Sequence, residues 1–157
     1  MAFERSFAIR FGDVDPAGTV FYPRFFQFFH ELFEEFLAVQ CDLPYEMLVH
    51  RRRVGFPTVN IEANFRRPLR LGDHCYIRLT LVKVGRSSLV MDFHTWNGTI
   101  PSSAVRITTV CVNLDKGSSV RIPADIRERI LTQLAPSDQC TEGNSPAPFP
   151  PARIHDL

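Results

Sequence analysis

The sequence predicts an α+β fold in which a curved antiparallel sheet of about five strands wraps one long central helix. Three observations carry this prediction: a strongly amphipathic helical pattern at residues 24–40, alternating strand patterns from residue 75 onward, and a tail dense in proline and polar residues from residue 135. We therefore expect one folded domain over residues 1–134. Residues 135–157 should form a C-terminal tail without an independent fold.

The predicted helix contains neither glycine nor proline between residues 24 and 40, and Pro23 suits its first turn because the missing N–H costs nothing there. Plotted at about 100° per residue, its apolar side chains gather on one side. They are Phe25, Phe26, Phe28, Phe29, Leu32, Phe33, Phe36, Leu37 and Val39. A helix face this rich in phenylalanine is not stable in contact with water. A sheet curled around the helix is the simplest way to bury it.

Four segments are predicted as strands, and the last three of them alternate apolar and polar residues. They are residues 3–10, 75–81, 89–94 and 105–111. The Gly85-Arg86-Ser87 and Asn97-Gly98 sequences predict hairpin turns between them. Two short helical segments are expected as well, at residues 44–49 and 122–134.

Composition excludes several classes of partner and site. The formal net charge of +1 gives no general attraction to nucleic acid or to anionic membranes, and no apolar run is long enough for a membrane span or a signal peptide. Four scattered cysteines without a CxxC pair predict reduced thiols rather than disulfides or a metal site. These features predict a cytoplasmic protein that binds neither nucleic acid nor membrane.

Three stretches carry a resemblance to a known family. FGDVDPAGTVFYPRFF at residues 11–26 resembles the active-site loop and helix start of the 4-hydroxybenzoyl-CoA thioesterase family. VGFPTVNIEANFRRPLRLGD at 54–73 and VGRSSL at 84–89 resemble the next two stretches of that family, in the same order. The resemblance implies a hotdog fold and hydrolysis of an acyl-CoA without a metal or cofactor, coenzyme A being part of the substrate. It also implies active sites at the interface of a dimer, which often pairs into a tetramer.

The resemblance implies that Asp15 is the catalytic carboxylate, that Gly18 lies beside the acyl group and that the backbone N–H of Tyr22 faces the thioester carbonyl. Thioester hydrolysis passes through an oxyanion, and the unpaired N–H groups at a helix start suit its stabilisation. The same positive helix end favours an ionised Asp15. Such a carboxylate can attack the carbonyl or deprotonate a water, and the sequence does not choose between these routes.

A purely structural interpretation of the same loop is available. In Asp13-Val14-Asp15-Pro16-Ala17-Gly18, an aspartate can cap the turn, Pro16 can set φ and Gly18 can take a left-handed conformation. From spacing alone this interpretation is favoured. The resemblance reverses the preference for Asp15 but not for Asp13, which we expect to be a structural capping residue.

The predicted substrate-binding residues are His30, Phe26, Thr58 and the hairpin Arg86-Ser87-Ser88. Where His30 stands, the family has an aspartate that accepts the substrate's phenol hydroxyl, which puts specificity for the 4-hydroxy compound in doubt. A histidine at the helix seam with a satisfied hydrogen bond is an equal alternative. The family's hairpin lies along the nucleotide, so Arg86 is favoured for the coenzyme A phosphates. The arginines at 51–53, 66–67 and 70 are more typical of a solvated face.

Two other functions compete with an acyl-CoA thioesterase acting on an aromatic or medium-chain acyl group. The first is an enoyl-CoA hydratase or hydroxyacyl dehydratase, which needs a histidine near the aspartate, whereas Asp15-Pro16 is followed by Ala17-Gly18. The second is a non-catalytic acyl-CoA-binding protein with the same pocket. The presence of Asp15 argues against this second alternative.

Overall fold

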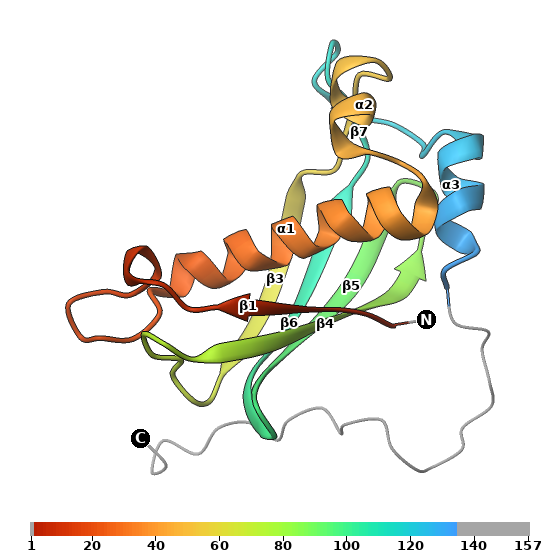
Figure 1. Ribbon diagram of the computed structural model, residues 1–157. Helices are drawn as coiled ribbons and strands as arrows, with labels where there is room; N and C mark the ends of the chain where they lie inside the picture. Colours follow the sequence, from red (N-terminus) through yellow and green to blue (C-terminus); the bar gives the residue numbers. More distant parts are fainter. Residues whose placement is uncertain (1, 135–157) are drawn as a thin grey trace.

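The computed structural model describes residues 2–134, in which one long helix lies across one face of a curved sheet (Figure 1). The helix is α1, Tyr22–Cys41. The sheet has five strands in the order β1-β4-β5-β6-β3, and all neighbours are antiparallel. Their bounds are β1 Ala2–Ala8, β3 Thr58–Phe65, β4 His74–Val84, β5 Ser88–Asn97 and β6 Ile100–Val110. The predicted α+β architecture and strand number are confirmed.

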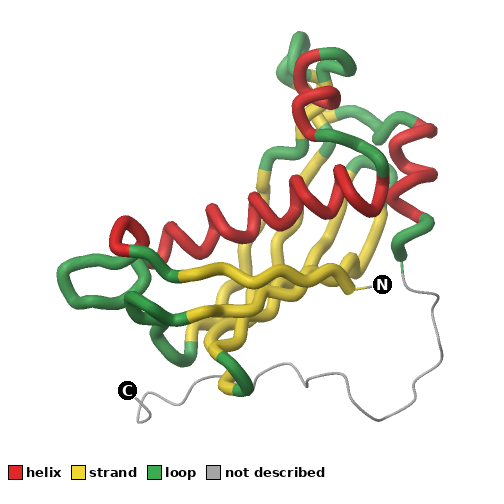
Figure 2. The backbone as a smooth tube through the Cα atoms, in the orientation of Figure 1, coloured by secondary structure: helices red, strands yellow, loops and turns green. Residues whose placement is uncertain are grey.

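Both predicted hairpins are present. The β4–β5 turn is closed by a hydrogen bond of 2.8 Å from the Gly85 N–H to the Ser88 carbonyl. The β5–β6 turn contains Gly98 at φ +59°, a left-handed conformation that glycine adopts without a steric penalty. These two turns make β4, β5 and β6 a continuous meander, part of the curved sheet that passes below and behind α1 in Figure 2.

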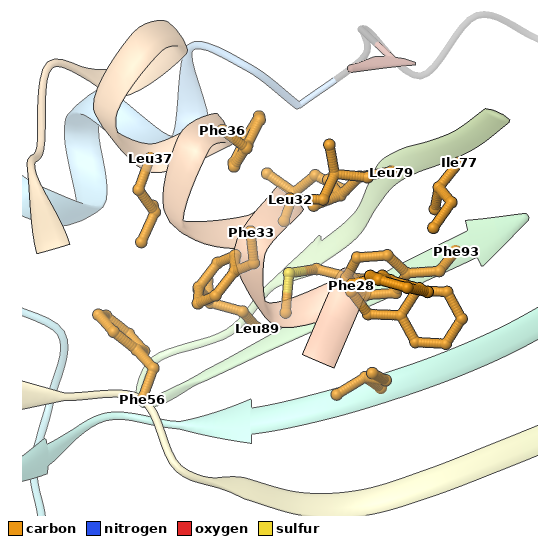
Figure 3. Close-up of a cluster of buried hydrophobic side chains, with 14 of the residues drawn as sticks. Phe28, Leu32, Phe33, Phe36, Leu37, Phe56, Ile77, Leu79, Leu89 and Phe93 are labelled. Atoms are coloured by element: carbon orange, nitrogen blue, oxygen red, sulfur yellow. The ribbon is translucent and has the colours of Figure 1, made fainter. Parts of the chain in front are cut away.

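The aromatic face of α1 forms the core together with the inner face of the sheet (Figure 3). The rings of Phe29 and Phe93 lie 4.9 Å apart, and Phe29, Leu32 and Leu37 are fully buried. The prediction for Val39 is wrong, because its side chain is 67% exposed. Phe3 of β1 packs edge-on against Phe36 of α1, with the two rings 6.1 Å apart.

Shorter elements close the end of the molecule at which α1 finishes. Helix α2 (Tyr45–His50) confirms the predicted helical segment. Helix α3 (Ala124–Leu131) is shorter than the predicted 122–134: it starts later because Pro123 is extended, and it ends at Leu131. A small second sheet joins β2 (Val54–Gly55), β7 (Val112–Asn113) and β8 (Ser118–Ser119), which the sequence did not predict. The predicted tail, residues 135–157, lies outside the described residues.

Strand β3 forms one edge of the main sheet, opposite the β1 edge, and it exposes several apolar side chains. Val59, Ile61 and Phe65 are 57%, 43% and 39% exposed, and nothing among residues 2–134 pairs with the outer side of this strand. A free edge with apolar side chains is a template for pairing with another chain. None of the described helices has the length and apolarity that crossing a membrane requires.

Candidate active site

The loop between β1 and α1 holds Asp15 in a tight turn. Asp15 Oδ1 accepts a hydrogen bond of 2.9 Å from the Ala17 N–H, and the Asp15 carbonyl accepts one of 2.9 Å from the Gly18 N–H. Gly18 has φ +79°, so the left-handed position predicted for it is confirmed. The tight turn predicted for this loop is therefore present. It leaves the second carboxylate oxygen of the half-buried Asp15 without a hydrogen bond among residues 2–134.

Asp13 has a different environment from Asp15. It is 4% exposed, and its carboxylate accepts hydrogen bonds from the Arg10 N–H at 2.8 Å and from Arg24 Nε at 3.1 Å. Its carbonyl accepts a third, of 3.0 Å, from the Phe21 N–H. Because these bonds tie the loop to the first turn of α1, Asp13 has the structural role expected for it.

The start of α1 presents one free backbone donor. Phe21 caps the helix, Pro23 has no N–H, and the Arg24 N–H bonds back to the Phe21 carbonyl at 2.8 Å. The Tyr22 N–H makes no hydrogen bond among the described residues, and its side chain is 62% exposed. A free N–H at the positive end of a 20-residue helix is a suitable oxyanion donor.

A small cavity lies between α1 and the β3 edge of the sheet. It has a volume of about 60 Å³, and three of the predicted substrate-binding residues, Phe26, His30 and Thr58, line it together. The rest of its wall is mainly apolar: Phe29, Phe33, Ile61, Met91, Phe93, Ile107 and Thr109. Of these, Thr109 was not singled out from the sequence, because an inward threonine on a strand has no pattern of its own.

His30 fits both interpretations given to it. Its Nε2 lies 2.9 Å from Glu34 Oε1, one turn along the same helix, which is the satisfied hydrogen bond of a seam histidine. Its ring also lines the cavity and meets the ring of Tyr45 edge-on at 5.5 Å. Burial raises the pKa of Tyr45, so this phenol is neutral near pH 7. A contact between His30 and substrate stays a prediction.

The Arg86-Ser87-Ser88 hairpin lies at the opposite end of the sheet from Asp15. The Asp15 loop is held to the chain just before β4, through Val20 N–H to Leu69 carbonyl at 2.9 Å, whereas the hairpin follows the end of β4. An 11-residue strand is about 35 Å long. One chain therefore does not bring Arg86 together with Asp15, as the positions of the loop and of the β4–β5 turn in Figure 1 illustrate.

The hairpin is held firmly by the end of the domain. The Ile122 N–H donates to the Arg86 carbonyl at 3.0 Å, the Cys111 N–H to the Ser87 carbonyl at 2.7 Å, and Arg127 Nε to the Gly85 carbonyl at 3.1 Å. These bonds use backbone oxygens only. The exposed Arg86 guanidinium is thus carried on a fixed backbone and faces water.

Two of the arginines at positions 51–53 are engaged in ion pairs of their own. Arg52 forms a two-pronged pair with Asp125, at 2.6 and 2.9 Å, and Arg53 pairs with Asp115 at 2.9 Å. This supports a structural interpretation of the run. Burial raises the pKa of the Cys41 and Cys75 thiols to about 11, so neither is a nucleophile at neutral pH. Residues 2–134 hold no cluster of three side chains suited to a metal.

Comparison of the sequence with known proteins identifies the family to which the chain belongs. The sequence profile of the thioesterase-like superfamily matches residues 9–130. A 1,4-dihydroxy-2-naphthoyl-CoA hydrolase of Prochlorococcus marinus is 35% identical over 91 residues, which cover 54% of this chain and 59% of that protein. The Synechococcus elongatus enzyme of the same name is 27% identical over 126 residues, covering 80% and 90%.

Solved structures agree with the fold. A 1,4-dihydroxy-2-naphthoyl-CoA thioesterase from Synechocystis superposes with a TM-score of 0.75 at 20% identity, over 83% of this chain and 96% of that one. A gentisyl-coenzyme A thioesterase, BH1999, gives a TM-score of 0.73 at 27% identity, over 80% and 98%. The predicted hotdog fold is confirmed. With its profile match over more than half of its length, the chain belongs to the thioesterase-like superfamily and is a thioester hydrolase.

Proposed function

We propose that this protein hydrolyses a hydroxylated aromatic acyl-CoA to the free acid and coenzyme A, with Asp15 as the catalytic carboxylate. The observation that carries the proposal is the Asp15 turn next to a helix start whose Tyr22 N–H makes no hydrogen bond within residues 2–134. The aromatic wall of the cavity at Phe26 supports an aromatic acyl group. The names of the relatives support it as well, since they specify dihydroxynaphthoyl and gentisyl thioesters.

The proposed reaction uses both groups at the start of α1. The Tyr22 N–H donates to the thioester carbonyl oxygen and stabilises the negative charge that develops on it. Asp15 either attacks the carbonyl carbon, giving a mixed anhydride that water then hydrolyses, or removes a proton from an attacking water. The carbon–sulfur bond breaks and coenzyme A leaves as a thiolate, which is protonated by solvent. No strong general acid is needed, because a thiolate is a good leaving group.

A complete site requires two copies of the chain. The exposed β3 edge suits antiparallel pairing with the same strand of a second copy across a two-fold axis. In such a dimer the Thr58 end of one β3 faces the Phe65 end of the other. The cavity and the Arg86 hairpin lie at the Thr58 end, and the Asp15 loop lies at the Phe65 end. We propose that each site combines Asp15 of one copy with Arg86 of the other, and that two dimers pair into a tetramer.

Release of coenzyme A measured with a thiol-trapping reagent tests the proposal directly. The panel is 1,4-dihydroxy-2-naphthoyl-, gentisyl-, 4-hydroxybenzoyl-, benzoyl-, phenylacetyl- and straight-chain acyl-CoA. We expect the highest kcat/KM among the hydroxylated aromatic esters. Fastest turnover of straight-chain esters would contradict the substrate class. Loss of enoyl absorbance without thiol release indicates a hydratase, and binding without either signal indicates a non-catalytic binder.

A further inference from the structure

The cavity beneath α1 contains a buried hydroxyl whose hydrogen bonding is unmet. Thr109 is 3% exposed, and its Oγ1 has no hydrogen-bond partner among the described residues. The residue lies on β6, directly across from Thr58 of β3, and it lines the cavity. The hydroxyl has therefore lost access to bulk water without gaining a partner in the part of the chain that the structure describes.

Such a group is costly unless something binds it. Valine has nearly the same shape as threonine, suits a strand equally well and would leave no polar atom unsatisfied. Buried polar atoms without partners are rare in folded proteins, and each calls for a reason. A ligand oxygen that reached Thr109 Oγ1 would gain a hydrogen bond to a hydroxyl that has no partner within residues 2–134 to give up, which makes this an efficient point of recognition.

We propose that the Thr109 hydroxyl binds an oxygen substituent on the aromatic ring of the acyl group. This inference rests on the proposed function and names the residue that selects hydroxylated rings. The cavity, at about 60 Å³, is smaller than the roughly 150 Å³ that holds a whole benzene molecule, yet larger than a single water requires. It has room for the substituted edge of a ring rather than for the entire ring.

The other polar groups on the cavity wall are less suited to this role. In the single chain Thr58 and His30 are exposed, so both can bond to water when no ligand is present, and His30 is also bonded to Glu34 at 2.9 Å. A ligand hydroxyl that bonds to either group merely exchanges one hydrogen bond for another. Thr109 therefore gives the larger difference between hydroxylated and unsubstituted rings.

The sheet provides matched controls for Thr109. Thr95 on β5 and Ser103 on β6 are fully buried and also have hydroxyls without a partner within residues 2–134, but neither lines the cavity. Thr95→Val therefore makes the same chemical change at a similarly buried site away from the proposed ligand. Thr109→Ser retains the hydroxyl and removes only a methyl group.

The test measures binding, so that it does not depend on turnover. The probes are phenacyl-CoA and its 2-, 3- and 4-hydroxy derivatives, thioethers that place a methylene between the carbonyl and sulfur and so cannot be hydrolysed. Titration calorimetry should show that one hydroxylated isomer binds wild type about tenfold more tightly than phenacyl-CoA, the scale of one hydrogen bond. Thr109→Val should reduce this ratio to about one, while Thr109→Ser and Thr95→Val retain it.

Two results would overturn the inference: no hydroxylated isomer binds more tightly than phenacyl-CoA, or the advantage survives in Thr109→Val. Circular dichroism and thermal melting check that each variant is folded, and Thr109→Ala replaces the valine variant if that one is not. A wild type that binds the probes with the expected ratio but releases no thiol from any ester refutes the proposed function and leaves the role of Thr109 supported. The two failures are thus distinguishable.

Discussion

Asp13 and Asp15 are separated by one residue, yet we assign their carboxylates different roles: Asp13 stabilises the loop, and Asp15 acts in catalysis. Asp13 is buried and bonded to Arg10 and Arg24, so removing its charge should weaken the fold. Asp15 is half-buried, and the hydrogen bond that its carboxylate accepts from the Ala17 N–H needs only a carbonyl-like oxygen. Since asparagine also provides such an oxygen, the pair Asp13→Asn and Asp15→Asn separates stability from catalysis.

We expect Asp15→Asn to lower kcat by ~100-fold or more and to leave the free energy of unfolding nearly unchanged, because it removes the nucleophile or base while keeping the turn. Asp13→Asn should instead lower the free energy of unfolding by about 1–2 kcal/mol, as the half-exposed Arg24 loses part of its charge-assisted bonding. Thiol release and urea unfolding on both variants provide the check. Near-wild-type turnover in a folded Asp15→Asn protein contradicts the mechanism.

His30 should influence which substrate is preferred more than how fast the best one reacts. A neutral imidazole accepts one hydrogen bond, so it replaces an anionic acceptor only in part. We expect 4-hydroxybenzoyl-CoA to be preferred over benzoyl-CoA only weakly, and His30→Ala to reorder the substrate panel with little change in the best kcat. A thousandfold preference for the 4-hydroxy ester would contradict the partial acceptor role given to His30, because one neutral imidazole acceptor does not discriminate so strongly.

His94, on the outer face of the sheet, should make stability depend on pH. Burial lowers its pKa from the ordinary value of 6.5; Asp92 opposes this shift, and Arg78 and Arg106 add to it. The unfolded chain therefore binds a proton at this residue at a higher pH than the folded chain does. The free energy of unfolding should fall as pH drops below about 6.5. Urea unfolding from pH 8 to 5 should show a shallower decline in His94→Gln than in wild type, and equal slopes would contradict the prediction.

Among the helices and strands, α1 was predicted most completely from the sequence. Its aromatic face repeats with the helical period over four turns and is bounded by Pro23, so no other structure fits it. Strands β4, β5 and β6 were predictable because one of their faces is buried and alternation follows. Strand β3 has no such signal, since seven of its eight residues are exposed. The two-residue strands of the small sheet are too short to show a period.

The contribution of α1 can be measured by two truncations on the same helix. Phe29→Ala should lower the free energy of unfolding by about 3–5 kcal/mol, because the ring is fully buried against Phe93 and leaves a cavity. Val39→Ala should change it by less than about 0.5 kcal/mol, because Val39 is largely exposed. A large loss in Val39→Ala would show that another surface covers the last turn of α1, such as a second copy of the chain.

At the scale of the whole molecule, the candidate site residues could be predicted from the sequence. Their distances from one another could not. Phe26, His30 and Thr58 were chosen from separate stretches, and the structure brings them to one cavity. Asp15 and Arg86 were chosen in the same way, and they lie at opposite ends of the sheet. Spacing along a chain does not reveal which strand ends coincide. That depends on sheet order and register, which only the folded structure provides.

Sharing of the site between copies can be tested by mixing two inactive variants. Asp15→Asn removes the carboxylate, and Arg86→Glu places a repulsive charge where the coenzyme A phosphates should bind. If each site takes one residue from each copy, co-refolding equal amounts should restore about a quarter of wild-type activity, because half of the dimers are mixed and each has one intact site.

The control is the activity of each variant refolded alone, which should remain low. No gain on mixing would show that Asp15 and Arg86 do not act across an interface. Sedimentation of the wild-type protein provides a second check, for which we expect at least a dimer. An active 18.0 kDa monomer would rule out the shared site altogether.

The position of α1 near the start of the chain has a consequence for synthesis on the ribosome. Only β1 of the strands that bury its aromatic face precedes α1; the others begin with β3 and are complete only at Val110, about 70 residues after α1 ends at Cys41. At the usual rates of translation, this interval lasts roughly 3–14 seconds. Throughout it, the most hydrophobic surface of the protein has emerged while its cover is still being made. The newly made chain is thus most prone to aggregate, and most in need of a chaperone, before its sheet exists.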